Sequence, residues 1–317
     1  MKVSVWMSAY NHEKYISNCL DSVLNQKTNF EFEIVLGEDC STDRTREIVL
    51  DYNKRYPGRF SLYLPEKNIG MMEMDIATGK LCRGEYIALL NGDDLWTDEN
   101  KLQVQSDFLD SNPDTVMCYH KARVENDTDG SSFDTVYPES GEELSTEYLL
   151  LGYNPVMTPT VMIRNVLKIP DWFAEMPYGD MPLYLLLSKK GRIRYIDRLM
   201  SVYRIHSEGQ WQGDSLINNL MKDLKFYEFM NRELNYEHDK SINLIFAQRY
   251  FDLVRLNINR NNLTEAGFYF KKLTSANNEF LNLNNSEISS LRKILYENAD
   301  IKDYNGLLSG AVKWKVN

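Results

Sequence analysis

The sequence has few cysteines, no long apolar run and no surplus of positive charge. Its 4 cysteines, at positions 19, 40, 82 and 118, have neither the paired spacing of a metal site nor the density of a disulfide framework. We therefore expect them to be reduced thiols, as in a cytosolic protein. No stretch approaches the roughly 18 to 20 apolar residues that a membrane span needs. These absences argue against a disulfide-stapled protein and against an integral membrane protein.

The charge balance is acidic, with a formal net charge of −10. Nucleic-acid binding needs clustered Lys and Arg, so we expect no nucleic-acid partner. A strongly basic membrane-binding surface is disfavoured too, although local basic patches leave peripheral membrane contact open. The sequence enters a predicted strand at Lys2, with no signal-peptide core before it. We expect a cytoplasmic protein, with a place at the inner face of the membrane left open.

The sequence does contain ample material for a core, with 43% hydrophobic residues, 20 Tyr and 13 Phe in 317 residues. Over the first 120 residues, segments typical of strands alternate with amphipathic helical segments. The predicted strands are 2–8, 31–37, 60–64, 86–90 and 116–121, and the predicted helices are 16–24, 45–52, 70–82 and 101–111. This alternation predicts an α/β fold, in which a mostly parallel sheet has helices on both faces.

The rhythm changes after residue 126. A loop is predicted at 126–141, and the later elements are helices at 145–151 and 180–190, strands at 160–164, 193–196 and 199–204, and a loop at 172–179. We divide the chain into an α/β domain, 1–212, and a helical region, 213–317. Apolar stripes at 242–253 and 266–273 predict a helical hairpin there, which serves packing or homo-oligomerisation, or else acceptor recognition.

Acidic turns follow two of the predicted strands. Glu38 and Asp39 come after the second strand, and Asp93 and Asp94 come after the fourth. The carboxyl ends of parallel strands meet at one edge of a sheet, where open α/β sheets bind ligands. Carboxylates there can accept hydrogen bonds from a base or a sugar, or hold a divalent cation. Each turn alone also fits an ordinary β-turn or helix cap, so the pair carries the interpretation.

Several ordered segments resemble the family 2 glycosyltransferases, which have the Rossmann-like GT-A fold. The resemblance spans about the first two-thirds of the chain. It is carried by Glu38-Asp39-Cys40-Ser41-Thr42-Asp43, Asn68-Ile69-Gly70 and Asn91-Gly92-Asp93-Asp94-Leu95-Trp96, together with segments 3–11, 20–26 and 84–87. It implies a GT-A sheet with an α-helical C-terminal extension and a nucleotide-sugar donor lying across the C-terminal edge of the sheet.

The resemblance also implies roles for residues at that edge. Ser8, Tyr10 and Asn11 would line the nucleoside pocket, and Asp39 would hold the base, for which uracil is commonest in the family. Asp93 matches the metal-binding acid of the family's Asp-x-Asp element, with Mn²⁺ or Mg²⁺ as the cofactor.

Three neighbours of Asp93 complete this element. Asn91 replaces the first acid of the family pattern, which weakens the ribose or metal contact expected there. Gly92 lets the backbone turn tightly beside a ligand. Asp94 would support the metal site or bind the sugar. Whether Asp94 or a histidine completes the metal shell stays open.

Later residues match the rest of the family's machinery. Asp180 lies where the catalytic base of an inverting transfer is expected, although a helix cap explains it equally well. His206 follows a strand, as does a histidine that completes the metal shell in related enzymes. Arg204 would meet the diphosphate, and Trp211 would cover the sugar or anchor the helical tail. We interpret His12 and His120 as surface or packing residues.

The resemblance thus implies an inverting, metal-dependent hexosyl- or N-acetylhexosaminyl-transferase. The donor would be a nucleotide sugar, with a UDP-sugar favoured, and the acceptor a glycan or a lipid-linked molecule of a cell-surface polysaccharide pathway. A catalytically silent nucleotide-sugar-binding or scaffolding module is the alternative. A nucleotidyltransferase would need a Gly- and Arg-rich run after the first strand, where Tyr10-Asn11-His12-Glu13-Lys14 stands instead.

Overall fold

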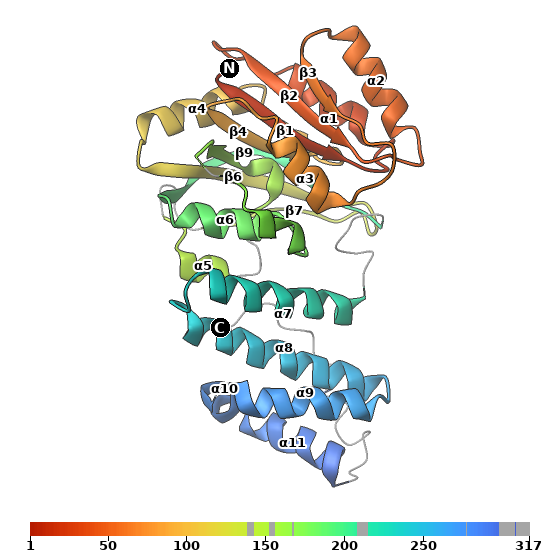
Figure 1. Cartoon of the computed structure of the whole chain (residues 1–317), viewed down its shortest axis with the longest axis vertical. Coiled ribbons are helices and arrows are strands. Elements are labelled where there is room, and N and C mark those ends of the chain that lie inside the picture. The colour runs from red at the N-terminus through yellow and green to blue at the C-terminus, as the bar shows by residue number, and fades with distance from the viewer. Residues whose placement is uncertain are drawn as a thin grey trace. The chain divides into compact units, whose positions relative to one another are not determined.

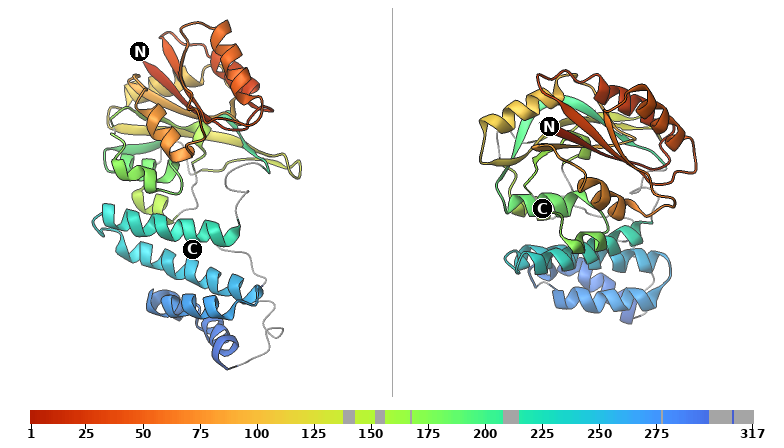
Figure 2. Two further views of the ribbon diagram at one scale, coloured as in Figure 1. Left: turned by 45° about the vertical axis from the view of Figure 1, so that its right-hand side comes forward. Right: turned by 45° about the horizontal axis from the view of Figure 1, so that its top comes forward.

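The computed structural model describes residues 1–137, 143–151, 156–166, 168–207, 215–276, 278–297 and 308 (Figures 1 and 2). The chain forms two compact units. The first comprises Met1–Thr146 and Asn154–Gly209, and the second comprises Glu147–Tyr153 and Gln210–Asn317. Assigning separate functions to 1–212 and 213–317 remains a prediction.

The first unit is built on one sheet with the strand order β3-β2-β1-β4-β8-β6-β9-β5. Its first four strands along the chain are parallel neighbours: β1 (Val3–Ala9), β2 (Phe32–Glu38), β3 (Phe60–Tyr63) and β4 (Tyr86–Asn91). β1 and β2 are buried almost throughout, as strands covered on both faces must be. The predicted α/β class is confirmed.

Beyond β4 the sheet is mixed. β8 (Met162–Arg164) runs antiparallel to β4 and to β6 (Thr115–Asn126), and β9 (Arg192–Ile205) runs parallel to β6. β5 (Leu95–Trp96) pairs antiparallel with the far end of β9. The pairing of β5 with β9 places the residues that follow β4 beside the C-terminal end of β9.

Helices cover both faces of the sheet, as the alternation predicted. The core on one face joins β1 to the apolar sides of α1 (Ile16–Leu24), α2 (Thr45–Arg55) and α4 (Lys101–Ser111). α3 (Met71–Gly79) and α6 (Asp180–Ser188) lie on the opposite side (Figure 2, right view). Gly37 permits the close approach of α3, because a Cβ there would lie 2.2 Å from Sδ of Met74.

Two predictions about strands need correction. The predicted strands 193–196 and 199–204 are one strand, β9, because its register against β6 steps from Ile196 to Leu199. The polar pair Asp197-Arg198 thus forms a bulge within this strand. The predicted loop 126–141 contains a short strand, β7 (Ser132–Asp134), that pairs with β6, while 138–142 lie outside the described residues.

The remaining elements of the first unit are short. η1 (Thr158–Thr160) precedes β8, and η2 (Asp171–Glu175) occupies part of the predicted loop 172–179. α5 (Thr146–Leu151) begins where the chain first enters the second unit.

The second unit is helical. Its helices are α7 (Leu216–Glu233), α8 (Asp239–Asn259), α9 (Leu263–Ala276), α10 (Asn278–Leu283) and α11 (Asn285–Tyr296). α8 and α9 form the predicted hairpin, and their apolar stripes meet in one core. Among the described helices, none has the length and apolar character that crossing a membrane requires.

Candidate active site

The C-terminal ends of three strands meet where the sequence places its candidate residues. In the strand register, Ser8 of β1 lies between Gly37 of β2 and Asn91 of β4, and Ala9 lies beside Glu38. The segments that follow these strands therefore start from one edge of the sheet. This is the position at which open parallel sheets bind ligands.

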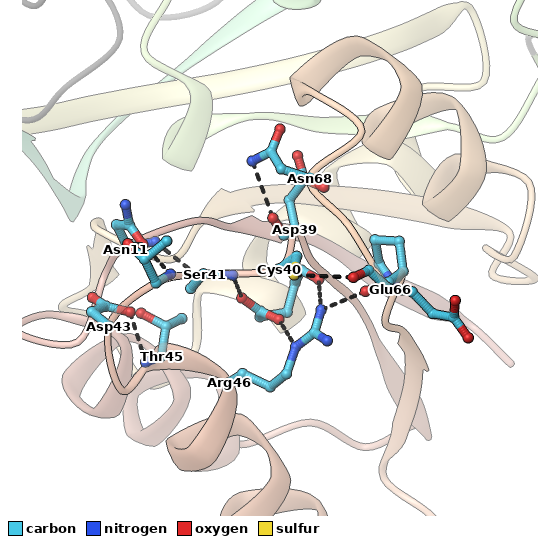
Figure 3. Close-up of polar contacts among 12 residues, drawn as sticks. Asn11, Asp39, Cys40, Ser41, Asp43, Thr45, Arg46, Glu66 and Asn68 are labelled. Carbon is cyan, nitrogen blue, oxygen red and sulfur yellow. Dashed lines mark hydrogen bonds and ion pairs between the residues drawn. The ribbon is translucent and has the colours of Figure 1, made fainter.

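The first acidic turn is held by its own carboxylates. Oδ1 and Oδ2 of Asp39 accept hydrogen bonds from the backbone N–H groups of Ile69 and Gly70, both at 2.8 Å. The Nδ2 of Asn68 donates to the Asp39 carbonyl at 3.1 Å (Figure 3). Asp39 thus ties the loop before α3 to the end of β2, and each of its oxygens keeps capacity for a further donor.

Glu38 stabilises the same turn through its side chain. Its buried carboxylate forms an ion pair with Arg46 and accepts a hydrogen bond from the Ser41 N–H at 2.7 Å. The Arg46 guanidinium also donates to the carbonyls of Glu38 and Pro65 (Figure 3). Since these contacts occupy it, Glu38 acts as a structural residue of the turn.

The residues after β1 are bound to this turn. Asn11 adopts a positive φ of 57°, its N–H donates to Oγ of Ser41, and its Oδ1 accepts from the Thr42 N–H. The neighbouring Tyr10 is 42% exposed. The structure therefore brings Ser8, Tyr10, Asn11 and Asp39 to one edge, as predicted, while their contacts with a nucleoside remain a prediction.

The second acidic turn meets the end of β9. The Nε2 of His206 lies 3.1 Å from Oδ2 of Asp93. The Arg204 N–H donates to Oδ1 of Asp94, and its Nη1 donates to the Asp93 carbonyl, both at 2.9 Å. Asp93, Asp94, Arg204 and His206 form one contiguous group, although the two strand ends are far apart in sequence. Trp211 lies outside the described residues.

One residue of this group was missed by the sequence interpretation. His12, which follows β1, has its Nε2 3.7 Å from Oδ2 of Asp93. Its backbone N–H donates to Oγ1 of Thr45, and its Nδ1 packs against Gly92, where a Cβ would lie 2.8 Å away. A lone histidine in a turn gives no signal of this proximity, because the contact depends on the β1–β4 register.

The pKa values of the two carboxylates in the second acidic turn, Asp93 and Asp94, are shifted in opposite directions. Burial raises the pKa of Asp94 well above its usual range, and the adjacent charge of Asp93 adds to this. Burial acts on Asp93 in the same direction, but His12 and then His206 outweigh it and hold the pKa of Asp93 below its ordinary value. At neutral pH the turn therefore presents the ionised carboxylate at Asp93.

The residues present suit a divalent ion that binds together with a nucleotide. Across the described ranges, no group of three or more His, Cys, Asp or Glu side chains that could hold a metal ion by itself is found. Asp93, however, has a buried Oδ1 without a hydrogen-bond partner in the described part of the chain, and an imidazole lies beside its Oδ2. Ions such as Mg²⁺ commonly take one or two carboxylates and complete their shell with phosphate oxygens and water.

The predicted base lies at the first turn of α6. Asp180 is half-buried, and its Oδ1 accepts a hydrogen bond from the Met181 N–H at 2.8 Å. It interacts electrostatically with Asp75 of α3, which in turn accepts a hydrogen bond from Oγ of Ser8 at 2.6 Å. Through Asp75, Asp180 is connected to the C-terminal end of β1. Asp75 is the second residue that the sequence interpretation missed.

Comparison with known proteins decides the family. Residues 4–163 match the model of glycosyl transferase family 2. The chain belongs to this family. An uncharacterized protein of Mycobacterium tuberculosis is 35% identical over 211 residues, which is 67% of this chain and 61% of that protein. The poly(ribitol-phosphate) beta-N-acetylglucosaminyltransferase TarS of Staphylococcus aureus is 26% identical over 81% of this chain and 45% of its own length.

Solved structures agree on the fold. The structure of S. aureus TarS 1-349 in complex with UDP-GlcNAc superposes with a TM-score of 0.58 at 18% identity, covering 99% of this chain and 93% of that one. A mannosyltransferase from Pyrobaculum calidifontis in complex with GDP-Man and Mn²⁺ gives 0.55 at 15% identity, covering 97% and 84%. The predicted GT-A fold and family are confirmed. The match spans only about three-fifths of the M. tuberculosis relative, namely 61%.

Proposed function

We propose that this protein transfers a sugar from a nucleotide-sugar donor to an acceptor hydroxyl, with inversion at the anomeric carbon and with the help of a divalent ion. The observation that supports this most directly is the meeting of Asp93, His206 and Arg204 beside the ends of the parallel strands. Family membership makes a glycosyl transfer the expected reaction. The second acidic turn, with the Arg204 guanidinium beside Asp93, suits a diphosphate that arrives with a metal ion.

The donor would be a UDP-sugar. TarS is named for N-acetylglucosaminyl transfer and has been solved with UDP and with UDP-GlcNAc, which supports this choice. We place the nucleoside against Tyr10 and Asn11, with the base toward Asp39. Asn91 and Gly92 would face the ribose or the diphosphate. The transferred group would be a hexosyl or N-acetylhexosaminyl residue, covered by Trp211.

Asp93 and His206 would hold Mn²⁺ or Mg²⁺, which, when bound, neutralises charge on the departing nucleoside diphosphate. Arg204 would provide a second positive charge for that diphosphate. Its orientation is fixed because Asp94 accepts its backbone N–H and its guanidinium lies 5.3 Å from the ring centre of Tyr15. The role of the buried Asp94 is then to hold Arg204 and the end of β9 in place.

Asp180 would act as the general base. It takes the proton of the acceptor hydroxyl while the hydroxyl oxygen forms the new bond to the anomeric carbon. The bond between that carbon and the diphosphate oxygen breaks on the opposite face, so the configuration inverts. The electron pair of the broken bond leaves with the nucleoside diphosphate.

The acceptor would be a glycan or a lipid-linked molecule, reached at the cytoplasmic face of the membrane. The names of TarS and of the chondroitin synthase of Pasteurella multocida, which is 27% identical over 78% of this chain and 25% of that protein, support a polymeric acceptor. The C-terminal helices would serve oligomerisation or acceptor contact.

A thermal-shift panel with UDP, UDP-GlcNAc, UDP-glucose and GDP-mannose, each with and without Mn²⁺, tests the donor proposal. A ligand that binds only the folded state raises the melting temperature. We expect UDP compounds to stabilise the protein more with Mn²⁺ than without. No stabilisation by any of these nucleotides would contradict the proposal.

An Asp180→Asn variant separates an enzyme from a silent binding module. We expect it to bind UDP with Mn²⁺ as the wild type does and to lose transfer by about a hundredfold or more. If wild-type protein binds UDP but neither hydrolyses nor transfers the donor, the binding-module alternative is correct. If Asp180→Asn transfers sugar at the wild-type rate, another residue is the base.

A further inference from the structure

Asp75 lies between the end of β1 and the first turn of α6. Its Oδ1 accepts the hydrogen bond from Oγ of Ser8 at 2.6 Å. Its Oδ2 lies 3.1 Å from the position that a Cβ on Gly179 would occupy, and Gly179 directly precedes Asp180. Within the described residues, Oδ2 makes no hydrogen bond. α3 and α6, which carry the two aspartates, lie on the same side of the sheet (Figure 2).

The two carboxyl groups act on each other. The pKa of Asp75 is raised to about 6: burial is the main cause, the Ser8 hydroxyl opposes it, and the charge of Asp180 adds to it. Like charges in one partly buried region favour keeping a proton on one of them. Such a pair titrates as a unit, so the apparent values belong to both residues.

Other charged side chains near α3 either form ion pairs or are exposed to solvent. On β2, Glu33 pairs with Arg83 and Glu38 pairs with Arg46. The residues of β1 that bond to α3, Trp6 and Ser8, carry no charge. On η2, Asp171 and Glu175 are exposed, as is Glu73 on α3 itself. Asp180 is the one ionised group found to act on Asp75 among the described residues.

We propose that Asp75 is a positioning residue for the base of the transfer reaction, whose negative charge makes Asp180 a stronger base while its Oδ1 fixes Ser8 at the edge of the sheet. This rests on the proposed function, because it assumes that Asp180 takes the acceptor proton. A proton that arrives on Asp180 relieves repulsion between the two carboxylates. The enzyme therefore gains driving force for proton transfer without a second base touching the substrate.

The test is Asp75→Asn, which removes the charge and keeps an oxygen that can accept from Ser8. We expect kcat to fall about tenfold while the donor KM stays within about twofold, since a weaker base slows the chemical step only. We also expect the acidic limb of the kcat–pH profile to move about one unit toward lower pH, because Asp180 then loses its neighbouring charge. If Asp75 had only a structural role, Asp75→Asn would leave the acidic limb of the kcat–pH profile unchanged.

Glu73→Gln is the matched control, since it removes an exposed carboxylate from the same helix and should leave the profile unchanged. UDP–Mn²⁺ thermal shifts check that each variant is folded and binds donor. If Asp75→Asn does not fold, Asp75→Ser replaces it and should show the same acidic shift. An unshifted limb in a folded, donor-binding variant overturns the inference.

The two proposals fail differently. If Asp180→Asn is inactive and the acidic limb of Asp75→Asn matches the wild type, only the role of Asp75 is wrong. If Asp180→Asn transfers sugar normally, the proposed base itself is wrong, and the inference about Asp75 falls with it.

Discussion

The Nε2 of His206 lies 3.1 Å from Oδ2 of Asp93, although 113 positions separate the two residues in the chain. The contact exists because β5, just after Asp93 and Asp94, pairs with Ser201 and Val202 near the end of β9. The short antiparallel pairing of β5 with β9 thus places the His206 imidazole beside Asp93. Neutral imidazole and an ionised carboxylate together are common ligands of Mn²⁺.

His206→Ala should weaken Mn²⁺ binding in the presence of UDP by about tenfold or more, because one of the proposed ligands is lost. Isothermal titration of Mn²⁺ into the UDP-loaded protein measures this directly. His238→Ala is the control, since that histidine contacts Glu147 in the second unit. Equal Mn²⁺ affinity in wild type and His206→Ala would remove His206 from the metal site.

Gly92→Ala should disturb the same site by a different route. A Cβ on Gly92 would lie 2.8 Å from Nδ1 of His12 and 2.9 Å from Cδ1 of Ile16, so the imidazole must move. We expect Mn²⁺ affinity to fall about tenfold, with only a modest loss of stability. Gly267→Ala is the matched control, because its nearest atom would be 3.9 Å away. Unchanged affinity in Gly92→Ala would mean that the position of His12 has no effect on the site.

The sequence predicted most of this edge and failed at specific points. Strands β1, β2 and β4 and their acidic turns could be found because apolar runs and turn residues are local signals. The position of His206 came from the family pattern. His12 and Asp75 carry no local signal, because their partners come from other elements through the strand register and helix packing. The bulge in β9 was misread as a gap between two strands because its charged pair interrupts the apolar pattern.

Asp39 shows a further limit of sequence reasoning. Its acidic character and position were predicted, but its bonds to the Ile69 and Gly70 N–H groups were not. A carboxylate that organises a loop and one that binds a base are the same in sequence. Only the hydrogen-bond partners of Asp39 in the folded chain show that its carboxylate organises the loop before α3.

Arg46→Met should destabilise the first unit by about 3 kcal/mol, because it leaves the buried Glu38 carboxylate without its ion-pair partner. Urea unfolding measures the loss. Arg44→Met is the control, since Arg44 and Glu47 form an exposed pair and should contribute nothing measurable. Adding Glu38→Gln to Arg46→Met should recover part of the stability. A loss no larger than that of Arg44→Met would show that solvent compensates for Glu38.

Lys101 predicts a pH dependence of stability that is separate from the active site. The side chain is fully buried, its Nζ lies 4.0 Å from the ring centre of Trp96, and no hydrogen-bond partner for it is found in the described part of the chain. Burial lowers the pKa of Lys101 from 10.5 to about 7. Between these values the unfolded chain binds more protons than the native one, so stability rises with pH.

We therefore expect wild type to gain about 1.5 kcal/mol more than Lys101→Met between pH 7 and pH 8.5 in urea unfolding. The comparison with the variant is needed because burial raises the pKa of Cys19, Cys82 and Cys118, which opposes the gain in both proteins. The contributions of Cys19 and Cys82 cancel in the difference, whereas Cys118 interacts with Lys101 and belongs to the effect that the comparison measures. Parallel pH dependences in the two proteins would mean that Lys101 stays charged in the folded state, with its ammonium stabilised by the face of Trp96.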